Sequence, residues 1–145
     1  MIAIGCDHAG VALKEELKAH MRGSLGLEVR DFGCPAGVKA DYPAIAARVT
    51  SVIIKGECQL GVLLCGTGVG MCIAANKVRG IRAACCGEPY SAILSRLHNE
   101  SNVLCLGARV VGTELAKMIL DAWLATEFEG GRHAARVDMI RRMER

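Results

Sequence analysis

The sequence predicts an α/β fold, a three-layer α/β/α sandwich on a five-stranded parallel sheet (Rossmann-like), with a basic helix at its C-terminal end. Short apolar runs alternate with segments of helical periodicity along the chain, a pattern typical of a parallel sheet covered on both faces. The run Leu60–Leu64 is rich in Val and Leu, as a strand buried on both faces should be. A glycine-rich turn follows it and leads into another apolar periodic segment.

Each expected strand is a short apolar run bounded by turn residues. The second alternates polar and apolar residues, which is typical of a strand near a sheet edge. The five expected strands are Met1–Ile4, Leu27–Phe32, Leu60–Leu64, Ile81–Cys86 and Val103–Leu106.

Helices are expected where apolar residues share one helical face. Leu13, Leu17 and Met21 mark such a face in the first helix. Pro43 lies near the first turn of the second helix, where proline is tolerated, and Gly56 ends it. The later helices are expected over 71–77, 89–98, 113–128 and about 132–145, with the break before the last at 129–131.

The composition indicates one domain, residues 1–145, with enough apolar sequence for a real core, since 52% of residues are hydrophobic. We expect the helix at about 132–145 to complete a site or a dimer. A net charge of +3 is too small to argue for nucleic acid or a membrane surface. No apolar run approaches the roughly 20 residues of a membrane span.

Eight cysteines occur without a C-x-x-C pair. The predicted strand Met1–Ile4 leads straight into Gly5-Cys6-Asp7-His8, so we expect no signal peptide. We therefore expect a reducing, cytoplasmic compartment and free thiols. Most of the cysteines lie in apolar runs, where cysteine behaves as a small buried hydrophobe.

Cys65 and the loop Gly66-Thr67-Gly68-Val69-Gly70 are the first candidate site. A strand, a glycine-rich turn and a helix leave backbone N–H groups free for an anion. A thiol at this place lies where a thiolate is stabilised, which suggests a base or nucleophile beside an oxyanion cradle. The loop lacks the Gly-Lys-Ser/Thr of a P-loop and fits the dinucleotide fingerprint poorly. A tight turn without a ligand is the alternative.

Two pairs of polar residues could supply acid and base groups. Asp7-His8 follows the first strand, where the alternative is an N-cap aspartate beside a surface histidine. His98-Asn99 ends a predicted helix, where a histidine can simply pair with the helix dipole.

Arginines near the C-terminal end could bind a phosphate. Arg132 and Arg136 are four residues apart and share a helix face, either as a solvated basic face or as a clamp for a phosphate. Arg109, just past the fifth strand, could join either arrangement. With the anion cradle, these residues describe a site for a small phosphorylated substrate.

The chain resembles the ribose-5-phosphate isomerase B family, which includes galactose-6-phosphate isomerase subunits. The resemblance covers essentially the whole chain and keeps the cysteine that some members lack. The motifs that carry it are GCDHAG at 5–10, DYP at 41–43, CGTGVG at 65–70, AANK at 74–77, IRA at 81–83, EPYSA at 88–92, HN at 98–99, GARVVG at 107–112 and EGGRHAARV at 129–137.

The resemblance implies an aldose–ketose isomerase that interconverts ribose 5-phosphate and ribulose 5-phosphate through an enediolate, without a metal or other cofactor. Cys65 would move the proton between C1 and C2, and Thr67 with the backbone of 66–70 would hold the oxyanion. His98 and Asp7 would open the furanose, and Asn99 would bind substrate oxygens. Arg132 and Arg136, with His8 and Arg109, would bind the phosphate.

The resemblance also implies a homo-oligomer, a dimer or tetramer, whose active site is shared between subunits. The nearest alternative is an isomerase for allose 6-phosphate, galactose 6-phosphate or a tetrose phosphate on the same fold. The presence of Cys65, His98 and both arginines in one chain favours a homo-oligomer over the paired unlike subunits of the galactose enzyme. A more distant alternative is a non-catalytic phosphate-binding module, which would have no use for Cys65 with Asp7 and His98.

Overall fold

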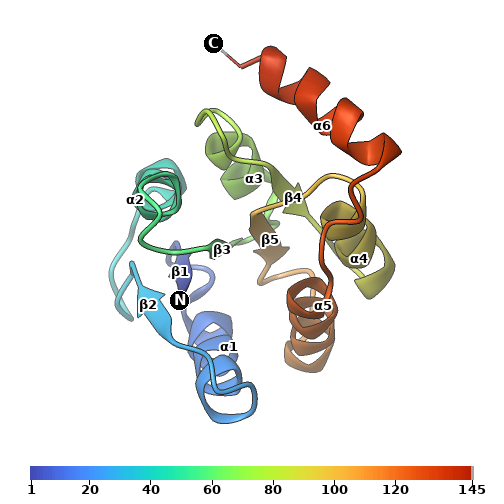
Figure 1. Cartoon of the computed structure of the whole chain (residues 1–145). Coiled ribbons are helices and arrows are strands. Elements are labelled where there is room, and N and C mark those ends of the chain that lie inside the picture. Colours follow the sequence, from blue (N-terminus) through green and yellow to red (C-terminus); the bar gives the residue numbers. More distant parts are fainter. Residues whose placement is uncertain (145) are drawn as a thin grey trace.

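Five parallel strands form one sheet in the order β2-β1-β3-β5-β4 (Figure 1). The computed structural model describes residues 1–144, and Arg145 lies outside the described residues. All five predicted strands are confirmed, and no strand end differs from its predicted position by more than two residues. Their bounds are β1 Ile2–Cys6, β2 Val29–Asp31, β3 Leu60–Cys65, β4 Ala83–Cys85 and β5 Val103–Gly107.

Helices cover both faces of the sheet, which confirms the three-layer prediction (Figure 1). One face carries α1 and α5, with α4 packed beside α5, and the other carries α2 and α3. The helices are α1 Val11–Gly23, α2 Tyr42–Ile54, α3 Val69–Ala75, α4 Pro89–Leu97, α5 Thr113–Ala125 and α6 Arg132–Arg142.

The fifth helix ends earlier than its apolar periodicity predicts. The backbone of Thr126 is extended, and its hydroxyl donates to the carbonyl of Ala122 at 2.7 Å. The guanidinium of Arg96 in α4 donates to the Thr126 carbonyl at 3.2 Å, so α4 holds the end of α5 in place. A tertiary contact between two helices therefore ends α5 three residues before the predicted break.

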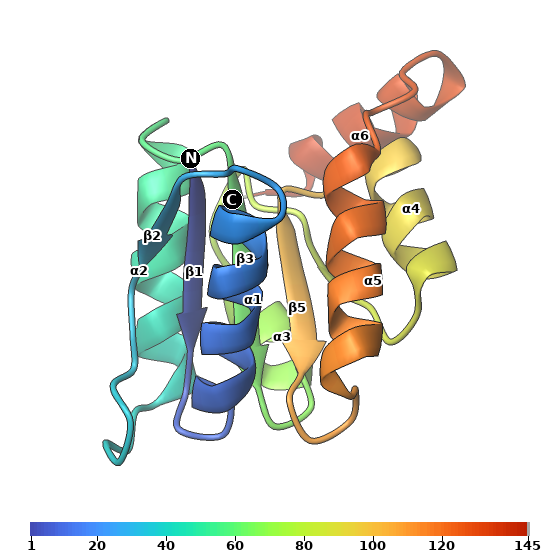
Figure 2. The same cartoon turned by 90° about the horizontal axis from the view of Figure 1, so that it is seen from below.

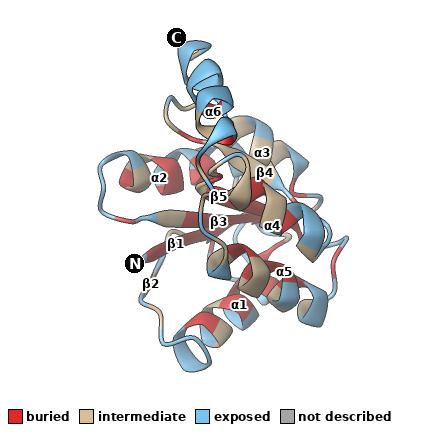
Figure 3. Cartoon of the chain, turned by 45° about the vertical axis from the view of Figure 1, so that its right-hand side comes forward, coloured by how far each residue is buried: buried red, intermediate tan, exposed pale blue. Residues whose placement is uncertain are grey.

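The core lies in two layers, one on each face of the sheet (Figure 3). Alternate residues of β3 and β5 face opposite layers, so both strands are almost wholly buried. Trp123 of α5 is the bulkiest fully buried side chain, and its indole N–H donates to the Ser101 hydroxyl at 2.8 Å. That hydroxyl also lies 2.8 Å from the hydroxyl of Ser95 in α4. A polar pair thus links α4, α5 and the start of β5 within the core.

All five strands run in the same direction, so they start along one side of the sheet and end along the opposite side. We call these sides the amino edge and the carboxyl edge. Figure 2 shows the arrowheads of β1 and β5 at one edge and α6 beyond the opposite edge. β3 has six residues, and at ~3.3 Å per residue its ends lie about 17 Å apart. Residues that follow a strand and residues that precede one therefore belong to different parts of the molecule.

The final basic helix begins at Arg132, as predicted, and only one side of it packs on the body of the chain. His133 and Val137 are buried, and Arg141 pairs with Glu100 at 2.8 Å. The Glu144 carboxylate accepts from the Gly80 N–H at 3.0 Å. Within residues 1–144, no helix combines the length and the apolar character that crossing a membrane requires.

We expect Trp123→Phe to lower the free energy of unfolding by about 2–3 kcal/mol, since it leaves the Ser101 hydroxyl without its indole donor and opens a small cavity. Urea denaturation followed by far-UV circular dichroism measures this loss. Ser101→Ala removes the other partner, and the double variant should cost less than the sum of the two. Additive losses would show that the hydrogen bond does not couple the two residues.

Candidate active site

Cys65 ends β3 at the carboxyl edge of the sheet and is buried. The Gly68 N–H donates to Sγ of Cys65 at 3.1 Å, so the loop folds back over the thiol. Gly68 has φ +80°, and a Cβ on it would lie 2.9 Å from the Leu106 carbonyl carbon, so glycine is required there. The thiol thus lies beside the glycine-rich loop and receives one backbone N–H from it.

The rest of the loop is shaped by its neighbours. The hydroxyl of Thr67 accepts from the N–H of Val69, the first residue of α3, at 3.3 Å. The Tyr42 ring lies 2.9 Å from where a Cβ on Gly70 would stand. Tyr42 appears in the sequence analysis only within the DYP motif, because nothing in its local sequence relates it to a loop 28 residues later.

Asp7 lies at the same edge, directly after β1. Its backbone N–H donates to the Leu64 carbonyl at 3.1 Å, beside Cys65. Its side chain is buried and accepts from the Ala9 N–H at 2.9 Å. Gly10, not Asp7, is the N-cap of α1, so the alternative reading of Asp7 as a helix cap is wrong. The neighbouring His8 is exposed.

Arg109 joins this cluster through the turn after β5. Its N–H donates to the Gly66 carbonyl at 3.0 Å, and the Ala108 N–H donates to the Cys65 carbonyl at 2.8 Å. The guanidinium stands beside Gly66, with Nη1 3.5 Å from where a Cβ would be. We call Asp7, His8, Cys65, the loop 66–70 and Arg109 the thiol cluster. The segments after β1, β3 and β5 therefore lie together at the carboxyl edge of the sheet.

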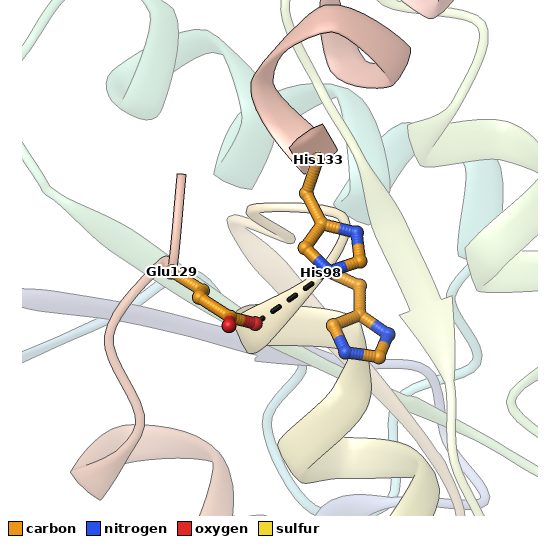
Figure 4. A group of neighbouring side chains, drawn as sticks. All are labelled: His98, Glu129 and His133. Carbon is orange, nitrogen blue, oxygen red and sulfur yellow. Dashed lines mark ion pairs between the residues drawn. The ribbon is translucent and has the colours of Figure 1, made fainter. Parts of the chain in front are cut away.

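The remaining candidates lie together at the opposite edge. His98 is the C-cap of α4, and its ring stacks on that of His133 with centroids 4.1 Å apart and planes 12° apart (Figure 4). Nε of Arg132 lies 3.5 Å from Nε2 of His133, and Arg136 follows one turn later. Exposed Asn99 directly follows His98. We call His98, Asn99, Arg132, His133 and Arg136 the histidine cluster.

One chain does not bring the two clusters together. α4 starts beyond the carboxyl end of β4 and returns along the sheet, so its last residue lies near the starts of the strands. Nε of Arg82, just before β4, donates to the Asn99 carbonyl at 2.9 Å. Cys65 and His98 therefore lie at opposite edges of the sheet.

His98, Glu129 and His133 form a compact group whose ligand-type atoms lie within 4.8 Å of one another (Figure 4). A carboxylate oxygen of Glu129 lies 3.5 Å from Nε2 of His133. Imidazole binds a metal through a lone pair in the plane of its ring, and two nearly parallel stacked rings do not direct their lone pairs at a common point. The geometry is that of a stack supported by a carboxylate.

Exposed cationic groups occur in both clusters. Arg109, Arg132 and Arg136 are exposed, and within residues 1–144 none of them has a carboxylate oxygen within 4.0 Å. Arg82 and Arg141, by contrast, both pair with Glu100. A guanidinium that no carboxylate holds can pair with a phosphate from solution.

Cys72 of α3 is a half-buried thiol with a lowered pKa, whereas the sequence analysis expected most cysteines to behave as small buried hydrophobes. All eight cysteines are free. A hydrogen bond with the Cys105 thiol, aided by the Cys85 backbone and by the Asn76 amide, lowers the pKa of Cys72 to about 7 against the opposing effect of burial. Burial and the same contact raise the pKa of Cys105. Local sequence does not show that these thiols are neighbours.

Comparisons with known proteins relate the whole chain to sugar-phosphate isomerases. Residues 2–140 match the family model described as Ribose/Galactose Isomerase. Ribose-5-phosphate isomerase B of Escherichia coli is 55% identical over 143 residues, covering 99% of this chain and 95% of that protein. D-erythrulose-4-phosphate isomerase of Pectobacterium atrosepticum is 49% identical over 140 residues, covering 96% of this chain and 91% of that protein. The structure of ribose-5-phosphate isomerase B from Clostridium thermocellum superposes with a TM-score of 0.95, at 49% identity, covering 98% and 95%.

We expect Gly107→Ala to displace the loop after Cys65, because the new Cβ would lie 2.6 Å from the Thr67 carbonyl oxygen. Any activity that depends on this loop should fall by about tenfold or more, since misplacement by 1 Å can cost 10²-fold. Gly87→Ala, where nothing lies within 4 Å of the new Cβ, is the matched control. Steady-state kinetics of both variants check this, and equal activities would show that the loop tolerates the shift.

We expect iodoacetamide to modify Cys72 with a rate that rises through a midpoint near pH 7, because the thiolate is the nucleophile and the pKa is about 7. Peptide mass spectrometry after timed labelling at several pH values measures this. Asn76→Ala removes a donor to Cys72 Sγ and should move the midpoint upward. A midpoint near pH 9 in the unmodified chain would contradict the assignment.

Proposed function

The chain belongs to the ribose/galactose isomerase family, and from this premise we propose that it interconverts ribose 5-phosphate and ribulose 5-phosphate as an aldose–ketose isomerase. The observation that carries the proposal is the pairing of Sγ of Cys65 with the Gly68 N–H inside a glycine-rich loop. The relatives named ribose-5-phosphate isomerase B in Escherichia coli and Clostridium thermocellum support the substrate.

Cys65 is the base in this proposal. It takes the proton from C2 of the open-chain aldose and returns it to C1, so that the intermediate is an enediolate. The oxygen that gains negative charge faces the backbone of 66–70 at the start of α3, where the positive end of the helix dipole lies. In the structure, the Gly68 and Val69 N–H groups donate to Sγ of Cys65 and to the Thr67 hydroxyl, respectively. Thr67 orients the loop through its hydroxyl contact with the Val69 N–H.

His98 and Asp7 open the furanose ring of the substrate in this proposal. His98 donates a proton to the ring oxygen while Asp7 accepts the proton of the anomeric hydroxyl, which is general acid–base catalysis. Asn99 binds a substrate hydroxyl beside His98. Arg132 and Arg136, with Arg109 and His8, bind the phosphate through charge-assisted hydrogen bonds.

We infer that the working site lies between two copies of the chain, the thiol cluster of one facing the histidine cluster of the other. The proposal is supported by the length of β3, about 17 Å at ~3.3 Å per residue, which separates the two clusters within one chain. Exposed apolar side chains on α3 and α6 also support it, since such patches mark protein interfaces. They are Val69, Ile73, Met139 and Ile140, with Met143 directly after α6.

Residues 1–145 are proposed as one domain whose last helix completes this shared site, acting without a metal or other cofactor. We place the protein in the cytoplasm on the strength of its eight free cysteines, which suit a reducing compartment. Dimers and tetramers both fit this arrangement.

A second candidate substrate is a tetrose phosphate, because a relative at 49% identity is named D-erythrulose-4-phosphate isomerase. Allose 6-phosphate and galactose 6-phosphate would need only a shift of the arginine clamp. A non-catalytic phosphate-binding module would use the arginines but neither Cys65 nor Asp7.

We expect the purified protein to isomerise ribose 5-phosphate in preference to allose 6-phosphate, galactose 6-phosphate and erythrulose 4-phosphate. Cys65→Ala should lose about 10²–10⁴-fold in kcat while it still binds phosphate, since general-base catalysis is worth that much. Cys58→Ala, at a buried thiol away from the loop, is the matched control. Full activity in Cys65→Ala would show that another group moves the proton.

We expect a mixture of Cys65→Ala and His98→Ala chains to regain activity although each variant alone keeps only a small fraction of the wild-type rate. In a symmetric dimer with shared sites, random pairing of the two chains restores about a quarter of the wild-type sites. Refolding the chains together and assaying ribose 5-phosphate measures this. A mixture as inactive as its components would mean that each site lies within one chain.

A further inference from the structure

Glu129 and His133 are polar residues of the 129–137 segment to which the proposed function assigns no part. Glu129 is anchored through its backbone, whose N–H donates to the Leu97 carbonyl at 3.0 Å, directly before His98. Gly130 and Gly131 then turn the chain at φ +70° and +56°, so that α6 starts against the end of α4. The turn brings the first buried side chain of α6, His133, onto His98.

The contact between the two histidines is extensive. The rings are 4.1 Å apart at their centroids and within 12° of parallel. His133 is only 4% exposed, whereas His98 is half-buried. One face of the His98 ring is therefore covered by a fixed partner, and the ring still has access to solvent.

The surroundings of His133 favour a neutral ring. Burial lowers the pKa of His133, and the charges of His98, Arg132 and Arg136 lower it further, while Glu129 opposes them. A neutral ring can stay stacked when His98 carries a proton, whereas a second charge 4.1 Å away would repel it.

We propose that His133 is a positioning residue that holds the imidazole of His98 in the orientation from which it donates its proton to the sugar ring oxygen. The proposal rests on the proposed function, in which His98 opens the furanose. Glu129 and Arg132 each lie 3.5 Å from Nε2 of His133 and limit rotation of its ring. His133 itself neither donates nor accepts a proton in the reaction.

The test compares two substitutions at this position. His133→Ala removes the stack and should lower kcat for ribose 5-phosphate by roughly 10–100-fold with KM nearly unchanged, as expected when a reacting group is misplaced. His133→Phe keeps a flat, uncharged ring and should stay within about threefold of wild type, because stacking needs no nitrogen. His20→Ala is the matched control, a histidine paired with Asp121 at a distant place between α1 and α5.

Two results would overturn the positioning role of His133. A rise in KM at constant kcat would assign His133 to phosphate binding and overturn the proposal. Loss of activity in His133→Phe equal to that in His133→Ala would do the same, since a ring nitrogen would then be required. If His133→Ala is unstable, His133→Asn replaces it, because the amide is too small to cover the His98 ring.

Double substitution tests whether His133 acts through His98. The variant His98→Ala/His133→Ala should be no slower than His98→Ala alone, because a positioning residue has nothing left to position. Losses that multiply would overturn the proposal. Full activity of His98→Ala would instead refute the assigned role of His98, whereas an inactive His98→Ala beside a normal His133→Ala would refute the present inference only.

Discussion

The close contact between the end of β5 and the loop after Cys65 is the constraint on which the candidate site depends. The backbone of Thr67 lies where a side chain on Gly107 would have to stand. This closeness allows the Cys65 and Gly66 carbonyls to accept N–H groups from the segment after β5. The loop is thereby held from two strands, and the Gly68 N–H reaches the thiol. A catalytic thiol benefits from such a fixed frame, because proton transfer is sensitive to small displacements.

The direction of α4 separates His98 from Cys65 within one chain. Since a helix that follows a parallel strand must return to the start of the next one, its two ends lie at opposite edges of the sheet. His98 therefore cannot join Cys65 within its own chain. Cys65 is the last residue of β3, whereas His98 lies a few residues before the start of β5. In the function proposed here, association of two copies overcomes this separation. The apolar side chains that α3 and α6 leave exposed would be covered by the same association.

The sequence predicted the strand and loop that carry Cys65 because local rules govern them. The glycines of the loop and the position of Cys65 after an apolar run were enough to place them at the carboxyl edge, and Asp7 followed from the parallel sheet. Tyr42, Cys72 and His133 were missed for the opposite reason. Each is important through a neighbour that is distant in sequence, as Cys72 is through Cys105 and as His133 is through His98.

The sequence alone determined the α/β class, all five strands, the start of the last helix and the family, because periodicity, turn residues and ordered motifs are properties of short segments. The tertiary structure decided that β5 lies between β3 and β4, that α5 ends at Ala125, and that the candidate residues divide into two clusters. These features depend on which elements pack together. Packing is set by the fit of side chains across the two core layers, such as Trp123 against Ser101, and no single stretch of sequence contains both sides of that contact.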